Sequence, residues 1–303
     1  MTRWLVRSET VYIIVYSKRE RRRVRNKLTN NNIDLTNVKF VVRRSDDTWI
    51  RDNGPMFVID NSGNLKVLDW GFNGWGYDAP FSYDDAIPAK AANRIGVQRI
   101  DLNDIVLEGG AVAVDGRGTL ITTRSATIEN GRNHGMSENE MEQYLLKYMG
   151  VSNVIWLDGQ AGGNEDITDT HIDGLVHFGD DSTIVTMSRD DLIYYGLLST
   201  DVDKLRAASD VNGNPYKFIE LPLTKNDVVT TYGENLRFKG SYVNFYIAND
   251  YVLMPSYNDP NDSVAQNILQ NFFTDRQVVK IDVRNLYANG GMVHCVTQQQ
   301  PLA

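Results

Sequence analysis

The chain has 303 residues, a formal net charge of −8, 42% hydrophobic residues and 23% charged residues. This composition predicts a soluble globular protein with a sizeable core, and the acidic balance argues against nucleic-acid binding and favours a cationic small molecule as substrate. No apolar run approaches the roughly 20 residues of a membrane span. The single cysteine cannot form an internal disulfide, so we expect a cytoplasmic protein without a membrane partner.

The first predicted elements are a strand, a helix and a second strand. A β-branched and aromatic run predicts a buried strand over residues 10–16. The basic segment 18–28 predicts a helix whose charges face solvent. A further apolar run predicts a strand over residues 38–42, and a polar loop over residues 46–55 follows it.

A unit of strand, strand, helix and strand then recurs at a spacing of roughly 55–75 residues, which is typical of units arranged around an axis. Short turns rich in Asn, Asp and Gly predict a hairpin at the start of each unit. The predicted hairpins occupy residues 56–69, 111–123, 175–187 and 243–255. The predicted helices occupy residues 84–95, 137–149, 191–208 and 262–273, and the closing strands residues 97–102, 154–157, 216–221 and 278–283. No linker separates the units, so we expect a single domain over residues 1–303.

A fifth unit can be assembled from the two ends of the chain. In this hypothesis an apolar strand over residues 292–296 carries Cys295 and pairs with the strand over residues 10–16. The basic helix and the strand over residues 38–42 complete the unit. Such pairing would close a ring and remove exposed sheet edges.

Polar residues stand at the same place in every unit, before or at the start of the first hairpin strand. They are Trp49 and Asp52, Glu108, His171 and Asp173, Ser241 and Asn244, and finally Cys295. Equivalent positions in a ring converge on its axis, so we expect a thiol, a histidine and three carboxylates in one cavity. Taken singly, Asp52 or Glu108 could cap a turn and Cys295 could be a small buried hydrophobe. Their joint placement favours a site.

These groups fit covalent chemistry on a guanidinium ion. A thiol needs a lowered pKa or a nearby base to act as a nucleophile, and a histidine transfers protons near neutral pH. Carboxylates disfavour a thiolate, but they bind a planar guanidinium group bidentately. Its carbon is an electrophile that a thiolate attacks, and its charge would lower the pKa of the thiol.

The remaining histidines and a possible metal site are weaker candidates. His171 and Asp173 could be two metal ligands, but no Cys or His at metal-binding spacing is near, so we expect no metal. We expect His177 and His294 to be packed or surface residues, and the loop around His134 carries no signal.

Seven short motifs follow one another along the chain, and five of them contain these candidate residues. They are DDTWIRDNGP (46–55), FNGWG (72–76), LEGG (107–110), DITDTHID (166–173), SYVN (241–244), YNDPND (257–262) and GGMVHCVTQQQP (290–301). From about Thr10 to the C-terminus the sequence resembles the agmatine deiminase (agmatine iminohydrolase) family, which includes the bacterial-type peptidylarginine deiminases. The resemblance implies an α/β fold, the five-bladed α/β propeller (pentein fold) of the guanidine-modifying superfamily, with its units around a pseudo-five-fold axis. Relative to that family the N-terminal segment is shortened, and Trp4 remains in it.

The resemblance also implies roles for the site residues. Cys295 would be the nucleophile, His171 the general acid and base, and Glu108 the carboxylate that orients the histidine. Asp52 and Asp173 would hold the guanidinium nitrogens. The residues that would line the substrate site are Asp52, Asp173, Trp49, Asn244, Gly290 and Gly291.

The activity implied is hydrolysis of agmatine to N-carbamoylputrescine and ammonia, a step of putrescine biosynthesis. It would pass through an amidino-thioether on Cys295, without metal or organic cofactor, and the protein could be a homo-oligomer. Free arginine or a C-terminal peptidyl arginine is the alternative substrate, and a catalytically inactive propeller is the alternative of a different class. By composition, segments 76–85 and 158–166 are candidates for a lid.

Overall fold

The structure is a computed structural model that describes residues 1–160 and 166–302. Within these residues the strands form five small sheets, one with two strands and four with three. Each three-stranded sheet has the predicted unit: an antiparallel hairpin, then at least one helix, then a strand parallel to the second hairpin strand. The four sheets are β3 (Met56–Ile59), β4 (Leu65–Gly71) and β5 (Gln98–Val106); β6 (Val112–Val114), β7 (Thr119–Thr123) and β8 (Asn153–Leu157); β9 (His177–Phe178), β10 (Thr183–Thr186) and β11 (Lys217–Glu220); β12 (Tyr246–Ile247), β13 (Tyr251–Ser256) and β14 (Gln277–Asp282).

Three of the four predicted connecting helices are confirmed: α5 (Ile87–Ile95), α6 (Glu138–Tyr148) and α9 (Asn261–Phe272). The single helix predicted over residues 191–208 is wrong. The chain forms α7 (Arg189–Tyr194) and α8 (Ser199–Arg206), because Gly196 between them adopts a φ of 91°, which no helix accepts.

The N-terminal unit contains α1 (Thr2–Leu5), β1 (Val11–Val15), α2 (Lys18–Asn30) and β2 (Val38–Val42). Helix α2 has no buried residue, as its basic sequence predicts. The prediction of a buried first strand is only partly right, since Val15 alone among the residues of β1 is buried.

The predicted pairing of the two chain ends is wrong. In the described chain β1 pairs with β2 alone, in parallel register, and the segment around Cys295 forms a short 3₁₀ turn, η3 (His294–Val296). The backbone of His294 is bonded by side chains: its N–H donates to Asn244 Oδ1 at 2.8 Å, and Arg51 Nε donates to its carbonyl at 3.4 Å. The backbone of this segment is therefore held by side chains and not by hydrogen bonds to a neighbouring strand.

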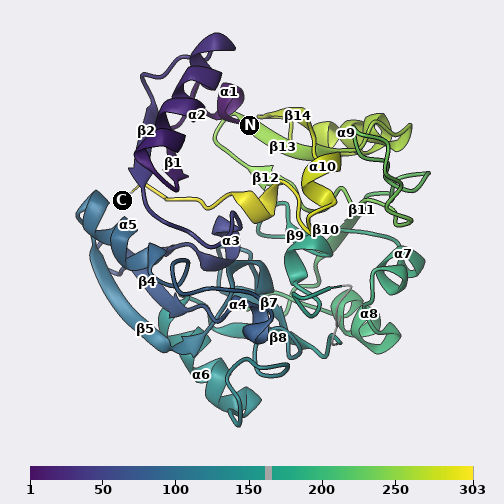
Figure 1. The fold of residues 1–303 in the computed structure, drawn as a ribbon. Helices are drawn as coiled ribbons and strands as arrows, with labels where there is room; N and C mark the ends of the chain where they lie inside the picture. The colour runs from purple at the N-terminus through teal and green to yellow at the C-terminus, as the bar shows by residue number, and fades with distance from the viewer. Residues whose placement is uncertain (161–165, 303) are drawn as a thin grey trace.

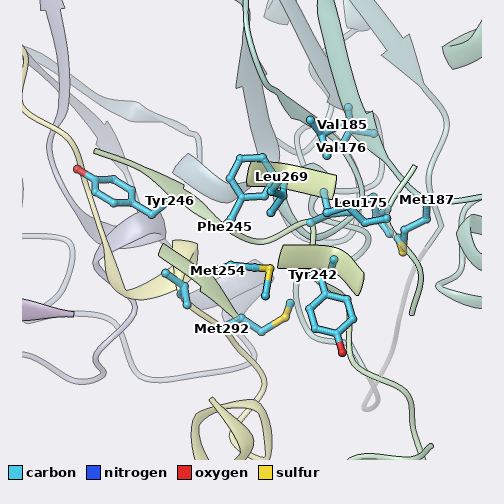
Figure 2. Close-up of a cluster of buried hydrophobic side chains, with 14 of the residues drawn as sticks. Leu175, Val176, Val185, Met187, Tyr242, Phe245, Tyr246, Met254, Leu269 and Met292 are labelled. Atoms are coloured by element: carbon cyan, nitrogen blue, oxygen red, sulfur yellow. The ribbon is translucent and has the colours of Figure 1, made fainter. Parts of the chain in front are cut away.

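Buried apolar clusters join neighbouring units. The largest one includes the last two three-stranded sheets and α8 and α9, and Figure 2 shows part of it around Leu175, Val185 and Phe245. Met292 belongs to this cluster and anchors the chain three residues before Cys295. A second cluster packs α6 against β4, β5, β7 and β8. Burial of each large apolar side chain stabilises the fold by about 1.5–3 kcal/mol, so the units are held together by shared cores.

Four short segments lie where the units meet: α3 (Ile50–Asn53), η1 (Gly109–Ala111), η2 (Ile172–Gly174) and η3. Segment α3 contacts both η1 and η3, and η1 contacts η2. Figure 1 shows α3 towards the middle of the molecule, with α2, α5, α6, α8 and α9 at its periphery. The described chain also contains two further short helices, α4 (Gly74–Tyr77) and α10 (Arg284–Tyr287).

No helix in the described part of the chain is long and apolar enough to cross a membrane. Of the two predicted lid segments, residues 76–85 are tied to the body of the protein, because the buried carboxylate of Asp84 accepts the backbone N–H groups of Asp46 and Asp47. The other predicted segment includes residues 161–165, which lie outside the described residues.

Candidate active site

His171 lies between two carboxylates. Its Nε2 is 2.7 Å from Glu108 Oε2, and its Nδ1 is 3.6 Å from Asp52 Oδ1. Burial opposes the charged imidazole, but the charge of Asp52 and the hydrogen bond to Glu108 outweigh it and raise the pKa of His171 to about 9. The histidine is therefore a cation at neutral pH and is ready to act as a general acid.

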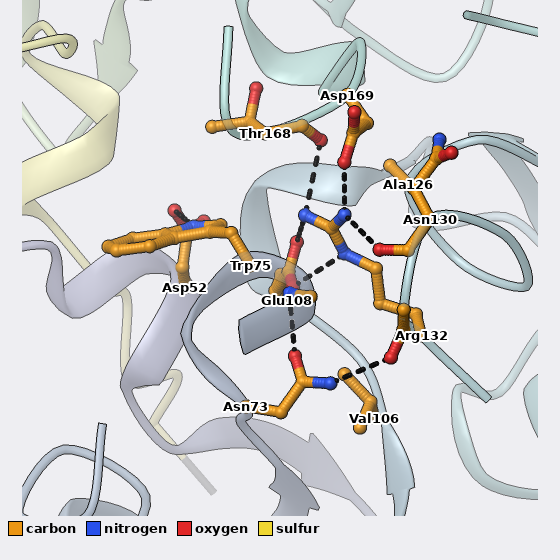
Figure 3. A network of polar contacts seen from close by, with 12 residues as sticks. Asp52, Asn73, Trp75, Val106, Glu108, Ala126, Asn130, Arg132, Thr168 and Asp169 are labelled. Carbon is orange, nitrogen blue, oxygen red and sulfur yellow. Dashed lines mark hydrogen bonds and ion pairs between the residues drawn. The ribbon is translucent and has the colours of Figure 1, made fainter. Parts of the chain in front are cut away.

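Asp52 is fixed by two donors, one from its own unit and one from the next unit along the chain. Its Oδ1 accepts the backbone N–H of Gly110 at 2.9 Å, and its Oδ2 accepts Trp75 Nε1 at 3.1 Å. Figure 3 shows the indole of Trp75 reaching this carboxylate. Burial, only partly offset by His171, raises the pKa of Asp52 to about 6, so the side chain remains a carboxylate at neutral pH.

The indole reaches Asp52 because the chain turns tightly in α4. Trp75 has a φ of 56° and lies between two glycines that also have positive φ. A bulky residue in this region is uncommon, which indicates that the site stores some strain here. The side chain of Asn73 stabilises the turn by accepting the N–H of Gly76 at 2.9 Å.

Asp173 has a partner that the sequence did not reveal. His294 Nδ1 lies 2.8 Å from Asp173 Oδ2. Burial and the nearby charge of Arg51 hold the pKa of His294 well below its ordinary value, so a neutral imidazole donates from Nδ1 to this carboxylate. The expectation that His294 only packs is therefore incomplete: the histidine fixes one carboxylate oxygen of Asp173.

Cys295 lies beside Asn244. The Asn244 Nδ2 atom is 3.5 Å from Sγ, while the same amide accepts the His294 N–H through Oδ1. Burial raises the pKa of the Cys295 thiol well above its ordinary value, and the charges of Asp173 and Asp52 raise it further. The thiol of Cys295 is thus protonated at neutral pH.

Trp49 forms one wall of this region. Its ring belongs to a buried aromatic cluster with Phe72 and Trp75, against which Cys295 packs. The ring also explains Gly291, since a Cβ there would stand 2.3 Å from the indole. Gly290 has a different reason to be glycine: it is exposed, faces open space and has a φ of 96°.

Two buried arginines complete the site, and the sequence patterns missed both. Arg51 donates to Gln298 Oε1 at 2.7 Å and Gln299 Oε1 at 2.9 Å, in addition to the His294 carbonyl. Arg132 binds Glu108 from the side opposite His171. Neither arginine follows a hydrophobic period, and each lies in a segment where only the tertiary fold supplies its partners.

The structure brings most of the predicted site residues into one cluster: Asp52, Glu108, His171, Asp173 and Asn244, which are buried, and the half-buried Cys295, with Trp49 beside it. Ser241, which stands at the equivalent place in its unit, has another task. Its hydroxyl donates to the Gly174 carbonyl at 3.0 Å and so braces the turn that follows Asp173.

Comparison with known proteins agrees with this geometry. A model of the Porphyromonas-type peptidyl-arginine deiminase family matches residues 1–301, and the chain belongs to this family. The agmatine deiminase of Pseudomonas aeruginosa is 35% identical over 292 residues, which is 89% of this chain and 78% of that protein. The predicted family and enzyme class, a hydrolase of amidine C–N bonds, are confirmed.

Solved structures show the same relationship. The agmatine deiminase of Enterococcus faecalis, described as catalysing its reaction, superposes with a TM-score of 0.86 at 28% identity, over 99% of this chain and 86% of that one. A Cys-to-Ser variant of the C. jejuni agmatine deiminase with substrate bound superposes with a TM-score of 0.79 at 25% identity, over 98% of this chain and 84% of that one.

The protonated thiol gives a prediction about reactivity. We expect the ligand-free protein to react with iodoacetamide along a pH profile whose midpoint lies above the ordinary thiol pKa of about 8.5. Asp173→Asn removes one negative charge, so its profile moves to lower pH and its alkylation at neutral pH is faster. Because Cys295 is the only cysteine, alkylation reports on this site alone. The urea-unfolded protein supplies the reference, and a wild-type midpoint below that reference would contradict the prediction.

Gly110 gives a second prediction. A Cβ at this position would stand 2.5 Å from His171 Nδ1 and 2.7 Å from Asp52 Oδ1, so Gly110→Ala must displace one of them. We expect kcat/KM to fall roughly 100-fold, the effect of a misplacement of about 1 Å. Gly116→Ala is the matched control, because this turn glycine has a φ of 72° and open space around its Cα. It should lower Tm and leave kcat/KM unchanged. Equal kinetics in the two variants would refute the prediction.

Proposed function

We propose that this protein hydrolyses agmatine to N-carbamoylputrescine and ammonia. The observation that carries the proposal is the placement of a protonated thiol, Cys295, among the buried carboxylates of Asp52 and Asp173, beside the cationic His171. Such a site is unfavourable for a neutral or anionic ligand and favourable for a guanidinium ion. The relatives named agmatine deiminase support the choice of substrate.

The proposal extends to the architecture. We take the five sheets as the blades of a five-bladed α/β propeller of the pentein type, arranged around a pseudo-five-fold axis and forming a single catalytic domain over residues 1–303. The repeated three-stranded units and the meeting of α3, η1, η2 and η3 support it. A cytoplasmic location and a homo-oligomeric assembly belong to the same proposal.

In the first half of the proposed reaction the guanidinium group enters between Asp52 and Asp173. Its positive charge offsets part of their negative charge, the pKa of the Cys295 thiol falls, and the thiol proton leaves to solvent. The thiolate forms a bond to the guanidinium carbon. The imidazolium of His171 gives its proton to a terminal nitrogen, the C–N bond breaks and ammonia departs, which leaves a cationic amidino-thioether.

In the second half His171 is neutral and acts as a base. It takes a proton from a water molecule as the oxygen attacks the same carbon. The C–S bond breaks with its electron pair on sulfur, so the thiolate returns and the ureido product is released. The proton that the product loses goes to the released ammonia. The net reaction consumes one water and yields one ammonium ion.

The buried arginines favour agmatine over substrates that carry a carboxylate. A free arginine or a C-terminal peptidyl arginine would need a cation for that group. Arg51 is engaged by Gln298 and Gln299, and Arg132 is engaged by Glu108, so neither guanidinium is offered to a ligand. Agmatine has no carboxylate and makes no such demand.

Ammonia release from agmatine, free arginine and a peptide ending in arginine tests the proposal. We expect release from agmatine, and we expect Cys295→Ala and His171→Ala to abolish it, because one removes the nucleophile and the other the proton carrier. The fold should survive both changes, as circular dichroism can verify. Release from either arginine substrate alone would move the assignment to that substrate. No release from any guanidine would favour the inactive propeller.

The two carboxylates give a further prediction. In Asp52→Asn and in Asp173→Asn the guanidinium loses a charge-assisted hydrogen bond, so we expect kcat/KM for agmatine to fall roughly 10- to 100-fold in each. Asp180→Asn, in the exposed turn between β9 and β10, is the matched control and should behave as wild type. If both site variants kept wild-type kinetics, Asp52 and Asp173 would not bind the guanidinium.

A further inference from the structure

Arg132 is the largest fully buried side chain of the protein's described part and carries a positive charge. It lies in the loop between β7 and α6. Its guanidinium grips Glu108 as a fork: Nε is 3.0 Å from Oε1, and Nη2 is 3.2 Å from Oε2. The same Oε2 receives His171 Nε2 from the other side. Glu108 is therefore held between two cations, one permanent and one that titrates.

The same guanidinium also holds the chain that leads into His171. Figure 3 shows Arg132 reaching the carboxylate of Asp169 and the carbonyl of Thr168 as well as Glu108. A further bond runs from Nη2 to the Ile167 carbonyl at 3.3 Å. One side chain thus connects the unit that supplies Glu108 with the segment that supplies the histidine.

That segment is under strain. Asp169 and Thr170, immediately before His171, have φ values of 55° and 68°. Thr170 is β-branched, and a positive φ is a genuine outlier for such a residue. Two hydroxyls hold it in place: Ser125 Oγ donates to the Asp169 carbonyl at 2.7 Å and Thr123 Oγ1 to the Thr170 carbonyl at 3.0 Å. With Arg132 they fix the direction in which His171 leaves the backbone.

We propose that Arg132 is a positioning residue that fixes His171 against Glu108 and keeps Glu108 ionised through both halves of the reaction. The inference rests on the proposed function. When His171 has given its proton to ammonia, Glu108 loses the charge of one of its partners. A buried carboxylate without a cation would take up a proton. Arg132 stays charged at every working pH, so the proton remains on His171 or on the reacting atoms.

The electrostatics of the cluster agree with this role. Burial alone would raise the pKa of Glu108, but the His171 hydrogen bond and the charge of Arg132 outweigh it and lower the pKa. Asp52 and Asp173 also face His171 and favour its cation, and Asp52 opposes ionisation of Glu108. Without Arg132, neutralisation of His171 would leave Glu108 with no cationic hydrogen-bond partner.

The test compares Arg132→Gln and Arg132→Lys with wild type in the pH profile of kcat/KM on agmatine. In Arg132→Gln we expect kcat/KM at neutral pH to fall roughly 10- to 100-fold and its acid limb to move to higher pH, because Glu108 protonates more easily. The second half of the reaction should slow most, so intact-mass analysis after acid quenching should show the amidino adduct on Cys295. Arg132→Lys keeps the positive charge and loses the bidentate hydrogen bonding to Glu108. It should leave the acid limb in place while lowering kcat.

Arg99→Gln separates this role from a loss of stability. Arg99 pairs with the buried carboxylate of Asp69 in the sheet of β4 and β5, outside the site. It should lower Tm without moving the pH profile or trapping an adduct. The proposal fails if Arg132→Gln behaves in the same way as Arg99→Gln.

An NMR titration of the His171 imidazole needs no substrate, so it tests Arg132 even if the proposed function is wrong. In wild type the imidazole signal should show a first titration step in the acid range, set by the neighbouring carboxylates of Asp52 and Asp173, and none from Glu108, which remains ionised. In Arg132→Gln a second titration step should appear there as Glu108 takes up its proton. Its absence would overturn the proposal. If Arg132→Gln does not fold, a shift of the acid limb in Arg132→Lys would overturn it as well.

Discussion

Three carboxylates buried at one place, Asp52, Glu108 and Asp173, are the constraint on which the rest of the site depends. Buried negative charge is tolerated only beside positive charge or strong donors. Glu108 has Arg132 and His171, and Asp52 has His171 and two neutral donors. Asp173 has two neutral side-chain donors, His294 and Asn244, and the charge of Arg51 nearby. Among the described contacts no arginine bonds to Asp52 or Asp173, so these two carboxylates are the ones that a cationic substrate would pair with under the proposed function.

The fold meets this constraint by taking the three carboxylates from three different units. Asp52 precedes β3, Glu108 precedes β6, and His171 and Asp173 precede β9. Each stands on a short helical turn or directly beside one, and the turns pack on one another. Glycine keeps the approach close where two of them meet, since any side chain at Gly110 would enter the space between His171 and Asp52. Short connections from rigid sheets therefore set the distances within the site.

Much of this could be predicted from the sequence. The periodic hairpin patterns predicted the four three-stranded sheets. The repeated position of polar residues predicted that Asp52, Glu108, His171 and Cys295 lie together. The failures have physical causes. The apolar run around Cys295 resembles a strand, but bonds from Asn244 and Arg51 fold it into a turn.

Arg132 shows what local pattern cannot reveal. It lies 24 residues from Glu108 and 37 from Asp169, in a loop with no hydrophobic period, and only the tertiary fold supplies both partners. The contact of Trp75 could not be predicted either. The direction of its indole depends on the positive φ of Trp75 itself, which the neighbouring glycines allow but do not require. The role of a charged residue in a loop depends on its contacts with residues that are distant in the sequence.

The protonated state of Cys295 bears on how the protein withstands oxidation between turnovers. Peroxides and related oxidants attack thiolates far more readily than thiols. Under the proposed function, the carboxylates that bind the substrate would also protect the sulfur between turnovers, because they keep the thiol protonated. A bound guanidinium ion would end this protection, because its charge lowers the pKa of the thiol. The proposed function therefore implies that the sensitivity of Cys295 to oxidants depends on the supply of substrate.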